Sequence, residues 1–566
     1  MDKQKLTRRI SALKGGRAEL VIRNARVVNV FTDTIEEADV GIADGVVLGV
    51  GGDWQGEQEI DAAGAYLAPG LIDGHMHIES SMAHPARFAD TVLRQGTTTV
   101  IADPHEIANV AGIVGIRYML DQTEGLPLSV FFMLPSCVPA TCFETSGASL
   151  SAVDLLTLAR EPRVLGLGEV MDYVAVTGAD EAMLDKLLAF RDRPIDGHAP
   201  LLSGRALQAY CLAGPFSDHE CSNFDEVKEK LAQGMHIQLR YGSACRGVEE
   251  IMSRVAKEGL PTERMLFCTD DKHLENIRAE GHINFILRRA VANGIPAVTA
   301  LKMATLNAAG CYGLRDRGAI APGFRADLVL FRDLKDFDVE NVICGGMLFT
   351  GVQEQAAPPV PAEIARSVHL APRRPDCLRL PVGQTMPILQ LVPGEVLTTL
   401  DRRPVPQQDG CFKAGEGLVK IAVLERHHAS GRIGLGVLEG LPIRGGAIAT
   451  TVGHDSHNLV AAGDNDGDML AAVDVLEECG GGYTVVSGGK TLALLPLPIA
   501  GLMSDAPLSE IFSRQQALLR AARQLGLDTD SADPFITLSF VALPVLPACR
   551  ITDKGMFDVT SMSFIK

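Results

Sequence analysis

Residues 69–81, PGLIDGHMHIESS, place two histidines directly after a short apolar stretch. A short apolar run bounded by glycine predicts a buried strand. Side chains at positions i and i+2 of a strand point to the same side, so His75 and His77 can bind one metal ion together. The stretch therefore predicts a strand that ends in a metal site.

Further apolar runs follow this strand and alternate with helix-like stretches such as 86–94 and 180–191. This alternation is typical of a parallel sheet covered by helices. Eight strand-helix units in about 240 residues match the usual size of a closed (β/α)8 barrel. We therefore predict an α/β fold with a TIM-like barrel, whose strands lie within 66–73, 98–103, 128–135, 164–170, 194–198, 216–220, 236–241 and 265–270.

The segments on both sides of the barrel predict a small β-sandwich domain. Asp44-Gly45 is a strong hairpin signal between two of the preceding strands. The expected strands before the barrel are 20–22, 27–31, 40–43 and 46–50. After the barrel, 322–331 (PGFRADLVLF) and 339–350 are again strand-like, and we expect them to pair with the first set.

The remaining segments complete the expected domain organisation. Residues 352–376 are rich in proline and alanine and predict a linker. The basic N-terminus lacks an apolar signal core, so we expect a helical lead-in there. A C-terminal α/β domain is expected, with strands at 417–424, 447–452 and 483–487. The predicted boundaries are 1–64 for the lead-in and first β-part, 65–312 for the barrel, 313–355 for the second β-part, 356–376 for the linker and 377–566 for the C-terminal domain.

Charge and cysteine content restrict the partners and the compartment. The formal net charge of −18 disfavours nucleic acid and anionic membrane surfaces. The 12 cysteines include no CxxC pair, which favours a reducing, cytoplasmic setting over a disulfide framework. No apolar run approaches the roughly 18 residues that a membrane span needs.

Metal-type residues fall at the ends of other predicted strands as well. Glu169 ends the fourth strand, His198 the fifth, His219 the sixth and Asp270 the eighth. Taken alone, each of these histidines is more often a packing residue than a ligand. Together with the two histidines of the first strand they form six candidates at one mouth of the barrel, where active sites lie. Imidazoles and carboxylates suit Zn(II), Fe(II) or Mn(II), so we predict a divalent metal site.

Other polar stretches follow strands and have competing interpretations. Asp103-Pro104-His105-Glu106 can serve the site or merely start a turn and a helix. Arg240 and Ser243, beside Gly242, can bind substrate or form an ion pair and a turn. Ser80 and Ser81 are expected to begin a helix. The C-terminal stretch 454–458 (HDSHN) can close over the barrel mouth, contact another subunit or form an Asx-type turn, and the remaining candidates for packing or surface histidines are His84, His273, His282, His427 and His428.

These motifs resemble the adenine deaminases of the amidohydrolase superfamily. The similar stretches are GHMHIESSM, GTTTVIADPHEIANV, GEVMD, DGHAP, DHE, CTDDK and HDSHN. The resemblance implies hydrolysis of adenine to hypoxanthine and ammonia in purine salvage, at a binuclear Mn(II) or Fe(II) centre, with Zn(II) also possible. Glu169 stands where hydantoinase-like members carry a carboxylated lysine, which favours this branch. The resemblance also favours a supporting role for His454, Asp455 and His457. We further expect a homo-oligomer, a dimer or higher.

The expected mechanism assigns a role to each candidate. Metal binding makes hydroxide available near neutral pH, and Asp270 can accept the proton of the water. Glu106 is the first candidate for the acid that protonates N1 of the purine, and Asp271 is the second. Asp103 and His105 can orient that acid or contact a metal or the substrate, and Arg240 and Ser243 can bind purine nitrogens.

Three alternatives remain open at this level. The same site can hydrolyse another cyclic amide or an N-acyl group, or deaminate cytosine. A metal-free scaffold protein is disfavoured because all six candidate ligands are present. A zinc-type nucleic-acid deaminase is disfavoured because its PCxxC signature is missing.

Overall fold

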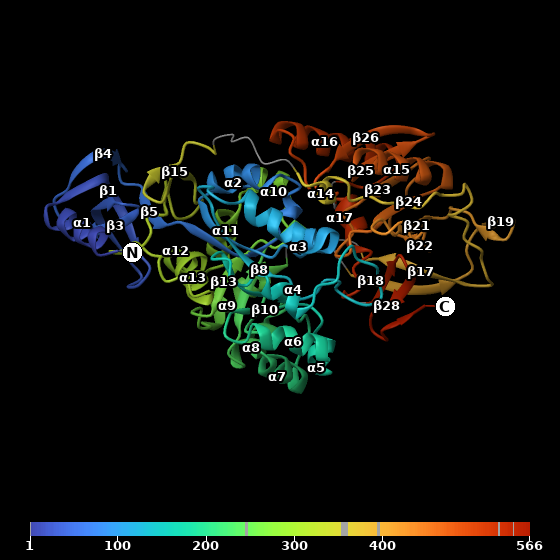
Figure 1. Ribbon diagram of the computed structural model, residues 1–566, viewed down its shortest axis with the longest axis horizontal. Coiled ribbons are helices and arrows are strands. Elements are labelled where there is room, and N and C mark those ends of the chain that lie inside the picture. Colours follow the sequence, from blue (N-terminus) through green and yellow to red (C-terminus); the bar gives the residue numbers. More distant parts are fainter. Residues whose placement is uncertain are drawn as a thin grey trace.

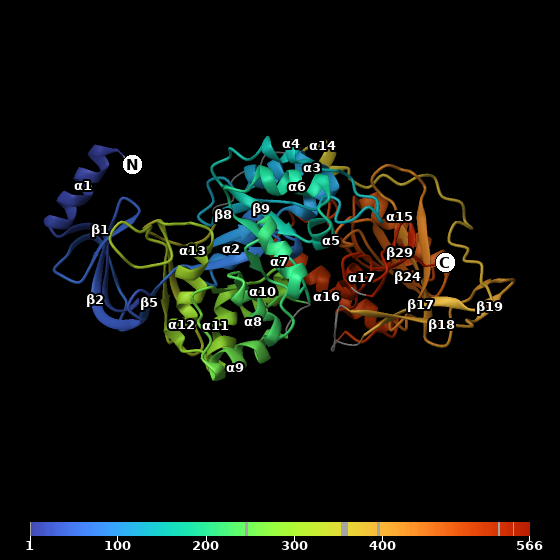
Figure 2. The same cartoon turned by 90° about the horizontal axis from the view of Figure 1, so that it is seen from below.

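The computed structural model describes residues 2–243, 247–352, 360–392, 397–529, 533–546 and 548–565. Three bodies follow one another along the long axis: a β-rich N-terminal part, a middle part of strands covered by helices, and a C-terminal α/β part (Figure 1). Figure 2 shows the same order from below. The middle part carries most of the predicted site residues and packs against the C-terminal part.

The middle part contains eight parallel strands in two sheets. One sheet has the order β10-β9-β8-β7-β6 and the other β11-β12-β13. Backbone hydrogen bonds join the sheets at both edges, since Asp270 N donates to His75 O (3.0 Å) and Phe216 N donates to Ile195 O (3.1 Å). The strands are β6 (Leu71–Met76), β7 (Thr97–Ala102), β8 (Ser129–Leu134), β9 (Val164–Val170), β10 (Ile195–Gly197), β11 (Ser217–Asp218), β12 (His236–Arg240) and β13 (Met265–Cys268).

Each of the eight predicted regions overlaps one of these strands, but the prediction of a single strand over 66–73 is wrong. Tyr66–Pro69 forms β5, which pairs with strands of the N-terminal sheet. The next strand, β6, begins only at Leu71. Gly70 lies between them, and its N–H donates to Asp327 O at 2.7 Å. The chain therefore leaves one sheet and enters the other at Gly70.

Helices cover the outside of these strands because each has one apolar face. In α9 the buried residues are Val248, Ile251, Met252 and Val255, spaced as one helix face requires. The other helices of this part are α2 (Pro85–Leu93), α3 (His105–Gln122), α4 (Ala152–Leu156), α5 (Tyr173–Thr177), α6 (Glu181–Ala189), α7 (Gly204–Ala213), α8 (Phe224–Ala232), α9 (Val248–Glu258), α10 (Leu274–Glu280), α11 (Ile283–Ala292), α12 (Ala297–Lys302) and α13 (Ala308–Cys311).

A buried lysine supports the short strand β11. Lys230 Nζ lies 2.6 Å from Asp218 Oδ2 and 2.7 Å from Glu226 Oε1. The other carboxylate oxygen of Asp218 accepts from Ala199 N at 2.8 Å, which joins the loop after β10 to β11. Because His198 precedes Ala199 and His219 follows Asp218, this ion pair positions two of the predicted ligands.

The N-terminal sheet is built from both flanks of the middle part, and its later strands join it through β5. Its order is β16-β15-β14-β5-β1-β2-β3, with β4 paired to β1. Asp44 and Gly45 have φ values of 55° and 74°, which fit a hairpin turn of type I′. The elements are α1 (Lys3–Lys14), β1 (Arg17–Asn29), β2 (Thr34–Ala43), β3 (Val46–Val50), β4 (Gln55–Asp61), β14 (Leu328–Phe331), β15 (Val339–Cys344) and β16 (Met347–Leu348).

Two expectations for this region have clear outcomes. The helical lead-in is confirmed as α1, which Asp2 caps by accepting from Lys5 N at 2.7 Å. The separate strands at 20–22 and 27–31 are wrong, because β1 runs through both with a register shift between Ile22 and Ala25. A bulge lets one strand continue where the sequence pattern breaks.

The C-terminal part contains a sheet of order β18-β17-β22-β21-β24-β23-β25-β26 and the helices α15–α17. The predicted strands correspond to β21 (Leu418–Leu424), β23 (Ala447–Thr450) and β25 (Gly482–Ser487). Within the predicted linker, α14 (Ala362–Ala365) is a short helix, and 356–359 lie outside the described residues. The other elements are β17 (Met386–Leu391), β18 (Thr398–Arg403), β19 (Gln407–Gln408), β20 (Cys411–Phe412), β22 (Ile433–Glu439), β24 (Leu459–Gly463), β26 (Lys490–Pro496), β27 (Cys549–Thr552), β28 (Gly555–Asp558), β29 (Ser563–Phe564), α15 (Asp466–Cys479), α16 (Leu508–Gln524) and α17 (Pro534–Phe540).

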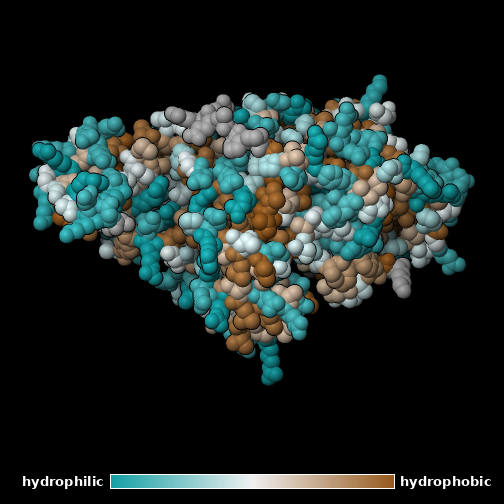
Figure 3. Space-filling model, in the orientation of Figure 1, coloured by the Kyte–Doolittle hydropathy of each residue, from teal (hydrophilic) through white to brown (hydrophobic). Residues whose placement is uncertain are grey.

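Two surface properties bear on partners. No helix among the described residues combines the length and the apolarity that a membrane crossing requires. Large apolar side chains are exposed on neighbouring helices of the middle part, including Val153 (73%), Leu188 (62%) and Leu212 (90%). Figure 3 shows apolar side chains gathered over the helices at the lower centre of Figure 1. The homo-oligomer stays a prediction.

Candidate metal centre and substrate hollow

Imidazoles and carboxylates from distant strands meet in one buried cluster. His75 Nε2 lies 3.5 Å from Glu169 Oε1 and 3.3 Å from Asp270 Oδ1. His77 Nε2 lies 3.3 Å and 3.0 Å from the same two oxygens. All four side chains are buried. The two histidines of β6 thus face a carboxylate from β9 and another that follows β13.

Glu169 turns its two carboxylate oxygens toward different histidines. While Oε1 faces His75 and His77, Oε2 lies 2.7 Å from His198 Nδ1 and 3.3 Å from His219 Nε2. A carboxylate has several lone pairs on two oxygens, so one placed in this way can bind a different cation with each oxygen. All six predicted ligands are brought together.

The cluster fits a divalent metal centre. Its buried atoms without a hydrogen-bond partner among the described residues include both ring nitrogens of His75, Glu169 Oε1, His198 Nε2 and His219 Nδ1. Buried polar atoms are rarely left without a partner, so these atoms indicate a group that is not part of the chain. The ligand atoms of His75, His77 and Glu169 all lie within 4.8 Å of one another, as do those of Glu169, His198 and His219. Both donor sets suit Zn(II), Fe(II) and Mn(II).

An arginine keeps the carboxylate at the end of the eighth strand ionised. Arg240 contacts Asp270 through Nη1, and its Nη2 donates to Glu220 Oε2 at 2.9 Å. Burial raises the pKa of Asp270, but Arg240, His75 and His77 outweigh burial and hold it well below its usual range. Asp270 is therefore a carboxylate, the form that binds a cation or accepts a proton.

Asp103 supports Glu169 from behind. Its Oδ2 accepts from Glu169 N at 2.9 Å, and its backbone oxygen lies 2.8 Å from His77 Nδ1. A Cβ at position 168 would overlap the Asp103 carboxylate, so Gly168 is required for this close approach. Asp103 thereby connects the end of β7 to two predicted ligands.

His105 and Glu106 extend the cluster toward the C-terminal part. His105 Nδ1 lies 3.2 Å from Glu169 Oε1, and its Nε2 lies 3.5 Å from Glu106 Oε1. Glu106 lies in the first turn of α3, yet its side chain turns to two residues of the C-terminal part. His454 Nδ1 lies 2.9 Å from Glu106 Oε1, and His457 Nε2 contacts Oε2.

A hollow lies beside the cluster and is lined by two parts of the chain. The middle part supplies charged and imidazole side chains, among them Glu169, Asp270 and Asp271. The C-terminal part supplies His454 and Asp455 together with an apolar wall of Phe540, Leu543 and Leu546. A polar wall opposite an apolar wall is what a flat, polar-edged ring requires.

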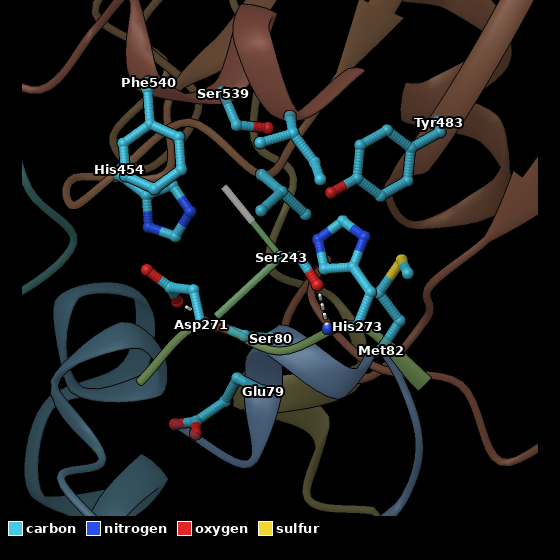
Figure 4. A pocket seen from close by; sticks show the side chains of 12 residues that line it. Glu79, Ser80, Met82, Ser243, Asp271, His273, His454, Tyr483, Ser539 and Phe540 are labelled. Atoms are coloured by element: carbon cyan, nitrogen blue, oxygen red, sulfur yellow. Dashed lines mark hydrogen bonds between the residues drawn. The ribbon is translucent and has the colours of Figure 1, made fainter. Parts of the chain in front are cut away.

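A second, adjoining hollow contains Ser80, Ser243, Asp271 and His273 (Figure 4). Ser243 Oγ donates to Asn276 Oδ1 at 2.6 Å and accepts from His273 N at 2.8 Å. Its hydroxyl thus fixes the turn after β12.

The expectation that Ser80 and Ser81 begin a helix holds only in part. Both lie in the 3-10 turn Glu79–Ser81. The Ser80 hydroxyl donates to Asp271, and α2 begins later, with His84 at its N-cap.

Comparison with known proteins decides the family. The model of the amidohydrolase family matches residues 66–348, and that of the adenine deaminase C-terminal domain matches 395–563. An adenine deaminase of Nitratidesulfovibrio vulgaris is 49% identical, covering 98% of this chain and 97% of its own length. The chain belongs to the adenine deaminase family of amidohydrolases.

Other members of this family are similar over their full length. Adenine deaminases of Desulfitobacterium hafniense and Bacillus pumilus are 43% and 42% identical, each covering 100% of this chain and 99% of its own length. Among solved structures, a beta-aspartyl dipeptidase of Fervidobacterium islandicum covers 60% of this chain and 99% of its own, with 19% identity and a TM-score of 0.46.

Several residues that line the main hollow were not predicted from the sequence. Glu220 directly follows the ligand His219, so its position could have been noted. Met171 and the apolar wall around Phe540 carry no motif and lie far along the chain. Among the histidines set aside as packing or surface residues, His84, His282 and His427 are buried, His273 is half-buried and His428 is exposed. His427 Nε2 bonds Ser456 O (2.7 Å) in the loop that reaches the site.

Proposed function

We propose that this chain hydrolyses adenine to hypoxanthine and ammonia, in purine salvage. The observation that carries the proposal is Glu169, whose two oxygens face separate pairs of imidazoles beside the mixed hollow. The names of the full-length relatives supply the substrate. No specific observation favours another cyclic amide, an N-acyl group or cytosine.

We propose that the eight parallel strands and their helices form one closed (β/α)8 barrel. The hydrogen bonds at both sheet edges support closure, because each edge strand then has a neighbour. The proposed parts remain 1–64 and 313–355 for the β-domain, 65–312 for the barrel and 377–566 for the C-terminal domain.

The proposed cofactor is a pair of divalent cations, Mn(II) or Fe(II), with Zn(II) as a further possibility. His75, His77 and Asp270 would hold one cation and His198 and His219 the other, with one Glu169 oxygen facing each group. A divalent cation held by these residues would lower the pKa of water from about 15.7 to about 7 and so would supply hydroxide at neutral pH.

Asp270 is the proposed proton acceptor. Asp270 is ionised, is buried from bulk solvent and lines the hollow. It can therefore take a proton from the attacking water and deliver it to the leaving amine. Arg240, predicted to bind substrate, is held between Asp270 and Glu220, and we assign it to positioning Asp270.

Asp271 is the proposed acid for the purine N1. It borders both hollows, and the Ser80 hydroxyl fixes its carboxyl group. Both oxygens of Glu106, the first candidate from the sequence, are instead contacted by histidines. Burial and the neighbouring Asp270 raise the pKa of Asp271, whereas three histidines overcome burial and hold the pKa of Glu106 well below its usual range.

The direct test is ammonia release by protein reconstituted with Mn(II) or Fe(II), with adenine, adenosine and cytosine as substrates. We expect turnover of adenine alone. Release from adenosine but not adenine, or formation of a ring-opened acid from a cyclic amide, would contradict the proposal. Asp271→Asn should lower kcat and change KM little, because the acid acts in the transition state.

A further inference from the structure

A second group of potential ligands lies where the barrel meets the C-terminal part. Glu106 comes from the start of α3, whereas His454 and His457 come from the loop between β23 and β24. Their ligand atoms all lie within 4.8 Å of one another. The side chains are almost fully buried, with exposures of 2%, 7% and 0%.

Hydrogen bonds within the chain satisfy only part of this group, since His454 Nδ1 bonds Glu106 Oε1 at 2.9 Å. Glu106 Oε2 and both ring nitrogens of His457 have no hydrogen-bond partner among the described residues. Oε2 and Nε2 nevertheless lie in direct contact, so both point into the same small space. Buried polar atoms that lack a hydrogen-bond partner indicate a ligand that is not part of the chain.

The group lies next to the centre around Glu169, since the ligand atoms of His77, His105 and Glu106 also lie within 4.8 Å of one another. His105 stands between them, with Nδ1 3.2 Å from Glu169 Oε1 and Nε2 3.5 Å from Glu106 Oε1. The proposed deamination uses neither His454 nor His457. A carboxylate and two imidazoles form a set that borderline divalent cations prefer, and three protein ligands leave a position for a fourth.

The surroundings hold this loop in place. Arg426 is fully buried and its guanidinium Nε donates to His457 O. His457 itself has a φ of 54°, a left-handed conformation that is costly for a histidine and needs such support. Asp455 offers a further carboxylate, because its Oδ2 has no hydrogen-bond partner among the described residues.

We propose that Glu106, His454 and His457 bind an additional divalent cation, which ties the C-terminal domain to the barrel. This site adds about one equivalent of metal to the two expected around Glu169. It does not depend on adenine being the substrate. Loss of its cation should loosen the contact between the two domains, because the ligands come from both.

The test is the metal content of the full-length protein. The protein is loaded with Mn(II) or Zn(II), excess ion is removed, and bound metal is measured by inductively coupled plasma mass spectrometry. We expect about three equivalents in the wild type and about one fewer in His457→Asn and in Glu106→Gln. Glu106→Gln leaves the C-terminal loop unchanged, so it keeps the test valid if the first variant does not fold. Glu169→Gln should show the complementary pattern and retain the equivalent at Glu106.

A matched control and a second readout make the result decisive. His428→Asn alters a neighbouring histidine whose Nε2 bonds Ser146 O at 3.0 Å outside the cluster, and it should retain all the metal. Chelator should lower the melting temperature of Glu169→Gln, where the additional cation alone remains. Only two equivalents in the wild type, or unchanged metal content in His457→Asn and Glu106→Gln, would overturn the proposal.

Discussion

His454 Nδ1 lies 2.9 Å from Glu106 Oε1, although the two residues belong to different parts of the molecule. Burial lowers the pKa of His454, but Glu106 and Asp271 raise it to about 9. The C-terminal part therefore places an imidazole directly against the residues that the middle part contributes to the site. This relationship explains why the hollow has walls from both parts.

Removing the apolar wall should weaken substrate binding. Phe540 borders the hollow and stacks on His454 with ring centroids 4.6 Å apart. Aromatic contacts of this kind contribute about 0.5–1.5 kcal/mol beyond area burial, so Phe540→Ala should raise the KM for adenine by roughly 2- to 10-fold. Steady-state kinetics with Phe564→Ala, an exposed aromatic elsewhere in this part, provides the comparison. Equal KM values in Phe540→Ala and wild type would argue against the wall.

The sequence predicted the polar wall much better than the apolar one. The metal-type residues could be recognised in the sequence because His75, Glu169 and their partners follow the ends of predicted parallel strands. The ends of such strands lie close together in space. Phe540 lies in a helix more than 250 residues beyond β13, and its position depends on how the middle and C-terminal parts dock. Docking depends on the complementary surfaces of the two parts, and short sequence patterns do not predict such surfaces.

Boundaries were predicted less well than elements. The run 66–73 has continuous strand character, so nothing in its composition reveals that Gly70 passes the chain from one sheet to another. Likewise, the break between 20–22 and 27–31 disappears because β1 continues through a bulge. In both cases hydrogen bonds between residues distant in sequence determine where the strand begins or ends.

Arg240 should set the acid limb of the pH-rate profile. Its positive charge lowers the pKa of Asp270 against the opposing effect of burial. Without that charge the carboxyl pKa rises, so Asp270 loses its ionised form at a higher pH and Arg240→Met should shift the acid limb upward. The profile of kcat/KM with adenine measures this shift. Arg254→Met, which removes an exposed arginine paired with Glu258 in α9, should leave the limb in place.

Loss of Lys230 should destabilise the strands that carry two ligands. Lys230→Met leaves the buried carboxylates of Asp218 and Glu226 without their cation. Breaking a buried ion pair in this way costs about 3–5 kcal/mol, so the melting temperature should fall by several degrees. Lys228→Met, on the exposed side of the same helix, tests whether loss of any lysine has this effect. Comparable melting temperatures in all three proteins would contradict the supporting role.

Substitution of the shared carboxylate should remove metal without unfolding the chain. Glu169→Gln keeps the side-chain shape but loses the charge that faces four imidazoles. We expect turnover of adenine to be abolished and metal bound around residue 169 to be lost, while circular dichroism stays that of the wild type. Activity like that of the wild type would show that Glu169 bridges nothing.

The most direct measurement is anomalous diffraction from crystals of the Mn(II)-loaded protein, recorded at the manganese edge. Two cations sharing Glu169 predict one peak within bonding distance of His75 and His77 and another within bonding distance of His198 and His219, with one Glu169 oxygen at each. Peaks that leave Glu169 uncoordinated, or a single peak bound by all four histidines, would contradict a centre that this carboxylate bridges.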